Sequence, residues 1–541
     1  MFILLWTLLN FFQAANTVLL NDEAYYWAYS NFLEWGYFDH PPMIAALIKA
    51  GFFLFHNELG VRFFILVLNT LTIVIIYSLL PRRNDILFYI IVCSISLLQL
   101  GGFIAVPDLP LIFFVALFFF VYKNFVASPS WANTTLLGIV MALMLYSKYH
   151  GVLVILFTLI SNPALLKNTR AYIAVLIAVL LFVPHLYWEY QHGFPSVQYQ
   201  LFERNESAYR IKYPFEYVAG QILLAGPFVG WILLWGAFKY QPANLFERAL
   251  KFCIAGIYVF FLLSTVKGNV EANWTVPVMI PLVILSHQYF YGKKTWQRIL
   301  LYSVPLTLIL VFFLRFYLIS ENKFIKSLNT NEFEQNKAWA QKIKTLSHEL
   351  PTVFINSYQK ASKYWFYGGI KSFSLNTPEY RRNNYNFWPI EKTMQGKPVY
   401  VISTGNPAYF TDSIKTTAGM LRGRRIDSFY SYSGVQLALK GRLTLDQDRN
   451  LIARISAKNI DAAELNGLSG KIQLNILQND DFIRSYQLVP LKIDTTAKII
   501  TGISSEQVYL PPGKYSVKLA ISTVLPGYSS LNSTHFRLVL Q

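Results

Sequence analysis

Long apolar runs fill the chain up to about Leu318 and then stop. A run of about 20 apolar residues can cross a bilayer as a helix, so the pattern predicts about eleven membrane segments. The predicted segments are 3–20, 61–80, 86–105, 109–122, 131–147, 151–161, 171–187, 215–237, 249–266, 274–291 and 299–318. The runs at 109–122 and 151–161 are short enough to be tilted or only half inserted.

Two further stretches lie between the first two predicted segments. Residues 43–56 are apolar but too short to span, which indicates a helix lying in the membrane interface. Residues 24–35 are rich in Tyr and Trp, and these residues prefer the interface. We therefore expect two interfacial helices joined at Asp39-His40-Pro41-Pro42.

The pattern of the remaining residues is that of a soluble protein. Residues 320–428 predict a small α/β unit, beginning with an N-cap at Asn331 and a helix that runs to about Leu350. From 429 to 541, short runs alternate between apolar and polar residues and are separated by turn signals, which predicts a β-sandwich. The fold class expected from the whole pattern is a polytopic α-helical membrane protein (residues 1–319) with these two units appended.

Composition and charge refine this prediction. The chain is 54% hydrophobic and 14% charged, with a net charge of +18. Basic residues gather in alternate loops of the membrane part and acidic residues in the others, so the basic loops are predicted to be cytoplasmic. The acidic loops and the C-terminal units then face the periplasm or cell exterior. There is no nucleic-acid-binding motif, so anionic lipid or a phosphate-bearing substrate is the expected partner.

Acidic residues at the predicted outer face are candidates for chemistry. Asp22 and Glu23 follow the first apolar run, where a carboxylate could act as a general base or simply mark the end of the segment. Asp108 lies between Pro107 and Pro110, and it either faces a polar cavity or caps a helix. Asp39 and His40 could bind a divalent metal, but two adjacent ligands are a weak signal and a capping turn is favoured.

Cations on the same face are exceptions to the charge rule. Lys148, Lys267, Arg204 and Arg210 could hold a phosphate by charge-assisted hydrogen bonds. The alternatives are contacts with lipid headgroups and pairing with nearby acids, and these are stronger for Arg204 and Arg210 than for the two lysines. No nucleotide-binding loop or serine nucleophile motif is present, so no soluble nucleotide cofactor is expected.

Five motifs occur in an order that resembles a known family. They are Asp22-Glu23, Asp39-His40-Pro41-Pro42, Asp108, Lys148, and Lys267-Gly268 followed by Asn273-Trp274 and Pro277. Over about residues 1–320, the chain resembles the GT-C membrane glycosyltransferases of the protein O-mannosyltransferase and aminoarabinose transferase superfamily. Aminoarabinose transferases have Glu-Lys where this chain has Asp39-His40, which leaves sugar specificity and any metal open.

The resemblance implies a sugar transfer from a polyprenyl-phosphate carrier with inversion at the sugar carbon. Asp22 would be the catalytic base, with Glu23 and Asp108 orienting the acceptor or shaping the cavity. Lys148 and Lys267 would stabilise the departing phosphate, with Arg204 and Arg210 as further donor-binding cations. The expected cavity residues are Tyr25, Tyr26, Asp39, His40, Tyr149, His150, Glu271, Asn273 and Trp274.

The expected partners are a polyprenyl-phosphate sugar and a lipid A, surface glycan or protein acceptor. The expected location is the bacterial inner membrane, with the C-terminal part periplasmic. A transporter or flippase of lipid-linked sugars is the alternative, although transporters often show internal repeats and none is visible here. A binding or assembly protein anchored by its helices is a third interpretation, and it leaves the ordered charged motifs without a role.

Overall fold

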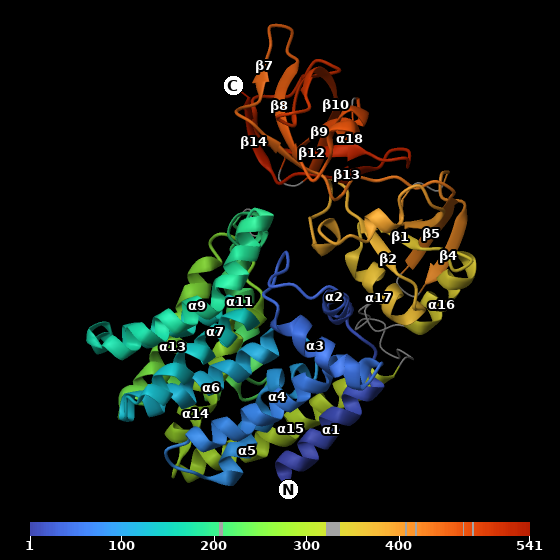
Figure 1. The fold of residues 1–541 in the computed structure, drawn as a ribbon. Coiled ribbons are helices and arrows are strands. Elements are labelled where there is room, and N and C mark those ends of the chain that lie inside the picture. Colours follow the sequence, from blue (N-terminus) through green and yellow to red (C-terminus); the bar gives the residue numbers. More distant parts are fainter. Residues whose placement is uncertain are drawn as a thin grey trace. The chain divides into compact units, whose positions relative to one another are not determined.

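The computed structural model describes residues 1–204, 209–320, 336–405, 408–416, 419–468, 470–478 and 481–540. They form two compact units, Met1–Phe333 and Glu334–Gln541 (Figure 1). The first unit is helical and the second contains both sheets. The N-cap predicted at Asn331 lies outside the described residues.

The first unit consists of helices joined by short turns, and every predicted membrane segment contains one. The α-helices are α1 (Phe2–Asn16), α2 (Asn21–Ser30), α3 (Met43–Leu54), α4 (Glu58–Leu79), α5 (Asp85–Ser94), α6 (Asp108–Ala127), α7 (Trp131–Ser147), α8 (Gly151–Ser161), α9 (Thr169–His192), α10 (Pro195–Gln198), α11 (Lys212–Ala225), α12 (Gly230–Lys239), α13 (Leu245–Ser264), α14 (Met279–Phe290) and α15 (Lys294–Ile319). The π-helical turns are η1 (Leu97–Gly101) and η3 (Tyr199–Glu203), and the 3-10 turns are η2 (Pro163–Lys167) and η4 (Ala272–Val278).

Within the described residues, 4 helices are long and apolar enough to cross a membrane, or up to 6 if each of two bent pairs is one span. The bent pairs are α1 with α2, at 86°, and α11 with α12, at 93°. Several predicted segments are therefore short or broken helices. The expected interfacial helix at 24–35 is wrong in its extent, because α2 ends at Ser30 and residues 31–42 form a loop.

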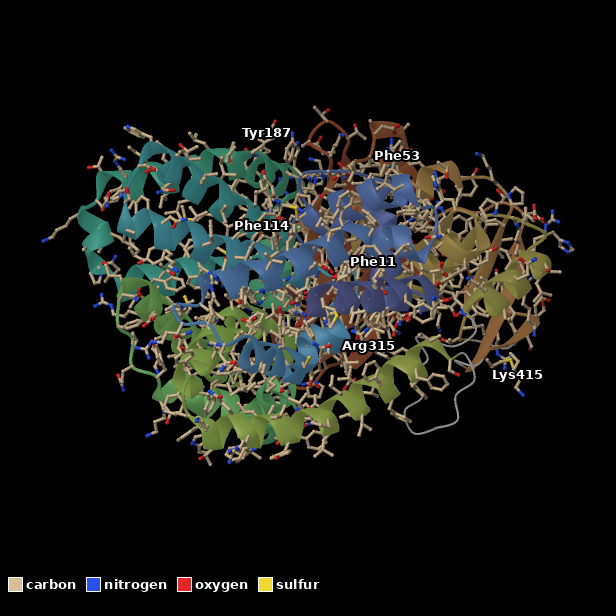
Figure 2. The ribbon with its side chains drawn as sticks, turned by 90° about the horizontal axis from the view of Figure 1, so that it is seen from below. Phe11, Phe53, Phe114, Tyr187, Arg315 and Lys415 are labelled. Atoms are coloured by element: carbon tan, nitrogen blue, oxygen red, sulfur yellow. The ribbon has the colours of Figure 1, made fainter. Side chains whose placement is uncertain are left out.

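The exterior of this unit is apolar, as a bilayer requires. On α9, Leu176, Leu180, Val183 and Tyr187 are exposed and recur every three or four residues, which places them on one face. The buried side of the same helix carries small or polar residues such as Ala178. Figure 2 shows Phe114 inside the bundle and Tyr187 at its edge. This arrangement is typical of helices that pack through small residues and face lipid with large ones.

The second unit begins with an α/β part built on a five-stranded sheet. Its strand order is β2-β1-β3-β5-β4, with β1 parallel to β2 and β3, and β5 antiparallel to β3 and β4. The helix α17 crosses over between β1 and β2, as parallel neighbours require. The elements are α16 (Asn336–Leu346), β1 (Thr352–Ile355), α17 (Tyr358–Gly368), β2 (Ser372–Leu375), β3 (Val399–Ser403), β4 (Asp412–Thr416) and β5 (Gly419–Ile426), with 3-10 turns η6 (Asn384–Asn386) and η7 (Glu391–Thr393).

The C-terminal strands form a β-rich region around one core. The strand order is β13-β12-β9-β10-β11-β8-β6, with β14 on β12 and β7 on β8. The long strand β10 pairs with β9 through its first half and with β11 through its second, so it joins two layers. The elements are β6 (Gln436–Leu439), β7 (Thr444–Leu445), β8 (Leu451–Lys458), α18 (Ala462–Gly467), β9 (Ile472–Gln478), β10 (Asp481–Asp494), β11 (Ile499–Ser504), β12 (Gly513–Ser522), β13 (Ser529–Leu531) and β14 (Phe536–Leu540).

The alternation of apolar and polar residues seen in the sequence gives the strands one buried face, and these faces form the core. Along β8, Leu451, Ala453, Ile455 and Ala457 are buried and the residues between them are not. Successive side chains of a strand point to opposite faces, so one face of β8 packs inward against residues of the other strands.

We expect residues 334–541 to fold without the helical unit, because both sheets and their core lie within this unit. Expressed alone, the fragment should show one cooperative thermal transition by near-ultraviolet circular dichroism. The matched variant Ile455→Ala removes buried methyl groups and should lower the free energy of unfolding by about 2–5 kcal/mol. A fragment without a cooperative transition would contradict this expectation.

Candidate active site

The corner between α1 and α2 positions the first acidic motif. Glu23 and Arg62 are both fully buried and form a two-pronged ion pair, with Nε to Oε1 at 2.7 Å and Nη2 to Oε2 at 2.5 Å. Arg62 also donates to the carbonyl oxygens of Ala14, Thr17 and Val18. These carbonyls end α1, where the helix can no longer satisfy them itself.

Each carboxylate oxygen of Glu23 accepts two hydrogen bonds. Besides Arg62, its carboxylate accepts hydrogen bonds from the backbone N–H groups of Leu20 and Ala105, at 2.9 and 2.7 Å. The Leu20 bond caps the N-terminus of α2, where a negative charge is favoured by the helix dipole. The structure therefore places Glu23 in the role of an anchor for α2 rather than in an open cavity.

Asp22 precedes Glu23 in the first turn of α2 and is exposed. Residues three, four and seven positions further along share its face of the helix, and these are Tyr25, Tyr26 and Tyr29. The ring of Tyr26 lies 5.5 Å from that of His40, and the hydroxyl of Tyr29 donates to Asp39 at 2.5 Å. The face of α2 that carries Asp22 thus leads directly to the second motif.

The loop of residues 31–42 contacts α9 and the π-helical turn η3. Gly36 makes this possible, since a Cβ at that position would lie 2.4 Å from the ring of Trp188. Trp188 donates to Glu34 at 2.5 Å, and Gln200 donates to the backbone oxygen of Asp39 at 2.9 Å. These contacts fix the backbone on both sides of Asp39 and His40.

Asp39 and His40 do not fit a divalent metal site. No group of three or more His, Cys, Asp or Glu residues that could hold a metal ion is found among the described residues. One oxygen of Asp39 already accepts from Tyr29, and Lys148 and Arg204 lie close enough to His40 to oppose its protonation. Burial lowers the pKa of His40 to about 4, with the Asp39 carboxylate opposing the shift and the two cations adding to it.

The third and fourth motifs form one buried ion pair. Lys148 Nζ lies 2.7 Å from Asp108 Oδ1, and the two side chains are 5% and 7% exposed. Asn273 donates to the other oxygen of Asp108 at 3.4 Å. Asp108 begins α6, Lys148 ends α7 and Asn273 lies in η4, so three distant parts of the membrane unit meet here.

Two histidines beside this pair keep unsatisfied polar atoms. The Nδ1 atoms of His40 and His150 are buried and have no hydrogen-bond partner among the described residues. His150 packs on the ring of Trp274 at 5.8 Å, and the guanidinium of Arg204 lies 4.6 Å over the same ring. Buried polar atoms are almost always paired, so these two nitrogens are available to a polar ligand or to water.

The remaining predicted residues divide into two groups. Tyr25 is buried against Tyr26 and Tyr29 in α2, and the hydroxyl of Tyr149 lies 3.0 Å from His185 Nε2, next to the 31–42 loop. Lys267, Arg210 and Glu271 are exposed, and no contact joins them to the Asp108–Lys148 pair in the described residues. Their predicted roles stay predictions, as does the catalytic role of Asp22.

Sequence reasoning missed Arg62 and Tyr29. Arg62 is a lone cation in the apolar run 61–80, and such a residue at membrane depth normally faces a buried partner. Tyr29 lies seven residues after Asp22, at the spacing of one helix face. Both signals were present in the sequence.

Comparisons with known proteins bear on the family and the fold. Residues 39–188 match the family model of dolichyl-phosphate-mannose-protein mannosyltransferases. The structure aligns with ArnT from Cupriavidus metallidurans, in the apo state and bound to undecaprenyl phosphate, each with a TM-score of 0.57. The alignments cover 78% of this chain and 97% of ArnT, at 12% and 13% identity. The chain has the ArnT-like GT-C fold. The resemblance to GT-C glycosyltransferases expected from the sequence is confirmed.

A curated relative adds a second comparison. The chain is 24% identical over 291 residues to the lipid A galacturonosyltransferase RgtD of Rhizobium johnstonii. This alignment covers 51% of the chain and 61% of RgtD, so the chain spans about three fifths of the length of that relative. The apolar helices of the chain fit a membrane protein.

We expect Arg62→Met to destabilise the GT-C unit strongly. The substitution leaves the Glu23 carboxylate buried without its cation. Removing one partner of a buried ion pair lowers the free energy of unfolding by about 3–5 kcal/mol. Thermal unfolding of the detergent-solubilised protein measures the change. The double variant Glu23→Gln with Arg62→Met should recover part of the loss. Equal stability of Arg62→Met and the parent protein would contradict the anchoring role.

Proposed function

We propose that the chain transfers a sugar from a polyprenyl-phosphate-linked donor to a lipid acceptor at the outer face of the bacterial inner membrane. The observation that carries this proposal is the buried Asp108–Lys148 pair flanked by the unsatisfied nitrogens of His40 and His150. A cation and unused polar atoms in one place suit an anionic, hydroxyl-rich ligand. The GT-C fold, together with the similarity to ArnT bound to undecaprenyl phosphate and to a lipid A galacturonosyltransferase, supports the donor and acceptor classes.

Lys148 and Arg204 would hold the phosphate of the donor. Asp108, which also accepts a hydrogen bond from Asn273, fixes the ammonium group of Lys148, while the guanidinium of Arg204 lies over the ring of Trp274. These cations are placed before the reaction, so they stabilise negative charge as it develops on the leaving phosphate without reorganising. Lys267 and Arg210, which are exposed, would contact the donor as it enters.

Asp22 would act as the general base. It would take the proton of the acceptor hydroxyl or amine as that group attacks the anomeric carbon of the sugar. The bond from this carbon to the phosphate oxygen breaks, the electron pair leaves with the polyprenyl phosphate, and the configuration inverts. Glu23 would be a positioning residue, since its contacts fix the first turn of α2 and with it Asp22.

The topology proposed with this function has about eleven membrane segments and a periplasmic C-terminal part. It rests on the sorting of charges between loops and places the site at the outer leaflet. The three domains at 1–319, 320–428 and 429–541 remain part of the proposal, with the β-sandwich contacting the acceptor or a partner protein.

We expect Asp22→Asn to abolish turnover while donor binding persists. Loss of a general base lowers kcat by about 10²–10⁴-fold, and the side-chain size is unchanged. Transfer of radiolabelled sugar from polyprenyl phosphate to lipid A, together with donor affinity by fluorescence titration, measures both quantities. Asp85→Asn is the matched control, because Asp85 also lies in the first turn of a helix. Full transfer activity in Asp22→Asn would refute the assignment.

We expect Lys148→Gln to weaken donor binding by about 10–100-fold, since hydrogen bonds to charged groups contribute about 1.5–3 kcal/mol. The substitution also leaves Asp108 buried and unpaired, so a fall in stability accompanies it. The double variant Asp108→Asn with Lys148→Gln separates the two effects. It should regain stability but not donor affinity. If the double variant regained donor affinity as well as stability, the Asp108–Lys148 pair would have only a structural role.

A further inference from the structure

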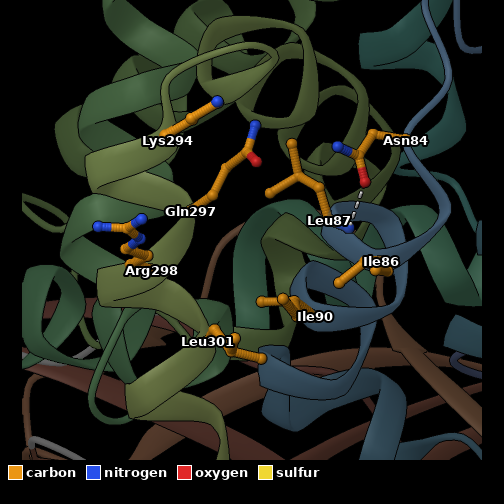
Figure 3. Close-up of a pocket in the computed structure, with 8 residues that line it drawn as sticks. All are labelled: Asn84, Ile86, Leu87, Ile90, Lys294, Gln297, Arg298 and Leu301. Atoms are coloured by element: carbon orange, nitrogen blue, oxygen red, sulfur yellow. Dashed lines mark hydrogen bonds between the residues drawn. The ribbon is translucent and has the colours of Figure 1, made fainter.

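A pocket lies between the N-terminal ends of α5 and α15 (Figure 3). It has a volume of about 210 Å³, which is smaller than the roughly 300–1,000 Å³ of pockets for drug-sized ligands. The size suits a headgroup rather than a whole lipid. Its lining residues are Asn84, Ile86, Leu87, Ile90, Lys294, Gln297, Arg298 and Leu301.

The pocket is polar at one end and apolar at the other. On α15, Lys294, Gln297, Arg298 and Leu301 follow one another at helical spacing and share one face. They meet the stripe of Ile86, Leu87 and Ile90 on α5, as Figure 3 shows. Lys294, Gln297 and Asn84 lie at one end of the pocket and Ile90 and Leu301 at the other, with Arg298 on α15 across the pocket from Asn84 (Figure 3).

The cations of the pocket are uncompensated. Lys294 and Arg298 lie four residues apart on one helix face, where like charges repel. All of the lining residues are described and none is acidic, and neither cation forms an ion pair in the described part of the chain. Asp85, the acidic residue next to the lining residue Asn84, accepts a hydrogen bond from Tyr77. Asn84 caps α5, whereas no side chain caps α15.

The surroundings add further positive charge. Arg82, Arg83 and Lys293 lie in the flanking turns, and each stacks on a tyrosine ring. The turn at 82–84 is itself fixed to α14, because Gln288 donates to the Arg82 carbonyl at 2.9 Å and His287 Nε2 lies 3.2 Å from the Asn84 carbonyl. The pocket is thus preformed by packing and contains no group that could neutralise its charge.

We infer that this pocket binds the headgroup of an anionic phospholipid, with the phosphate between Lys294 and Arg298 and the acyl chains along the apolar stripe. Basic pockets between membrane helices on the cytoplasmic side bind such headgroups. The apolar floor selects a lipid over free phosphate, because inorganic phosphate would leave Ile90 and Leu301 uncovered. The inference stands apart from the proposed sugar transfer, since it uses none of the residues assigned to that reaction.

Native mass spectrometry of the full chain in detergent tests the inference. Phosphatidylglycerol should bind more tightly than phosphatidylcholine, and Lys294→Gln with Arg298→Gln should weaken its binding roughly 25-fold, at about fivefold for each cation. The matched control is Lys167→Gln with Lys239→Gln, which removes two exposed cations from other turns with predicted cytoplasmic exposure. This control should keep the parent affinity.

Two further measurements keep the result decisive. Leu301→Trp retains both cations but fills the apolar end, so it should also lose the preference for phosphatidylglycerol. Inorganic phosphate at millimolar concentration should leave the lipid bound. An equal loss in the control variant, an unchanged affinity in the Lys294–Arg298 variant, or displacement by inorganic phosphate would overturn the inference.

Discussion

The ion pair between Arg62 and Glu23 is the contact on which the site depends. It sits where α1 ends and α2 begins at 86° to it, with the cation on the open carbonyls of one helix and the carboxylate on the open amides of the next. Each charge therefore lies at the helix end whose dipole favours it. A sharp corner in a membrane helix exposes backbone groups that lipid cannot satisfy, and this pair satisfies them internally.

A second buried guanidinium extends the same network. Arg315 of α15 donates to Asn10 of α1 and to the backbone oxygen of Gln99 in the π-turn η1. Arg62 and Arg315 both lie near the ring of Phe103, at 5.7 and 5.6 Å. Two residues after Phe103, the backbone N–H of Ala105 donates a hydrogen bond to Glu23. The first and last long helices of the unit are thus connected through one polar layer beneath the site.

The candidate site contains two kinds of polar group: charges that are fully bonded within the protein, and groups that can still bind a ligand. Glu23 and Arg62 are fully bonded to each other and to backbone, while Asp108 leaves Lys148 held but beside the unsatisfied nitrogens of His40 and His150. The buried histidine at position 40 stays neutral, since burial and nearby cations lower its pKa. A neutral ring can bond to a sugar or phosphate without adding to the charge already present.

The sequence by itself determined the two-part organisation, the GT-C resemblance and the types of residue at the site, because apolar runs, strand alternation and ordered motifs are local. It identified Asp22-Glu23 as a unit but could not assign the two carboxylates different surroundings. Only the tertiary structure decided that Glu23 is enclosed by Arg62, that Asp108 pairs with Lys148, and that α2 stops at Ser30. Those outcomes depend on contacts between residues far apart in the chain, and such contacts follow from packing rather than from spacing.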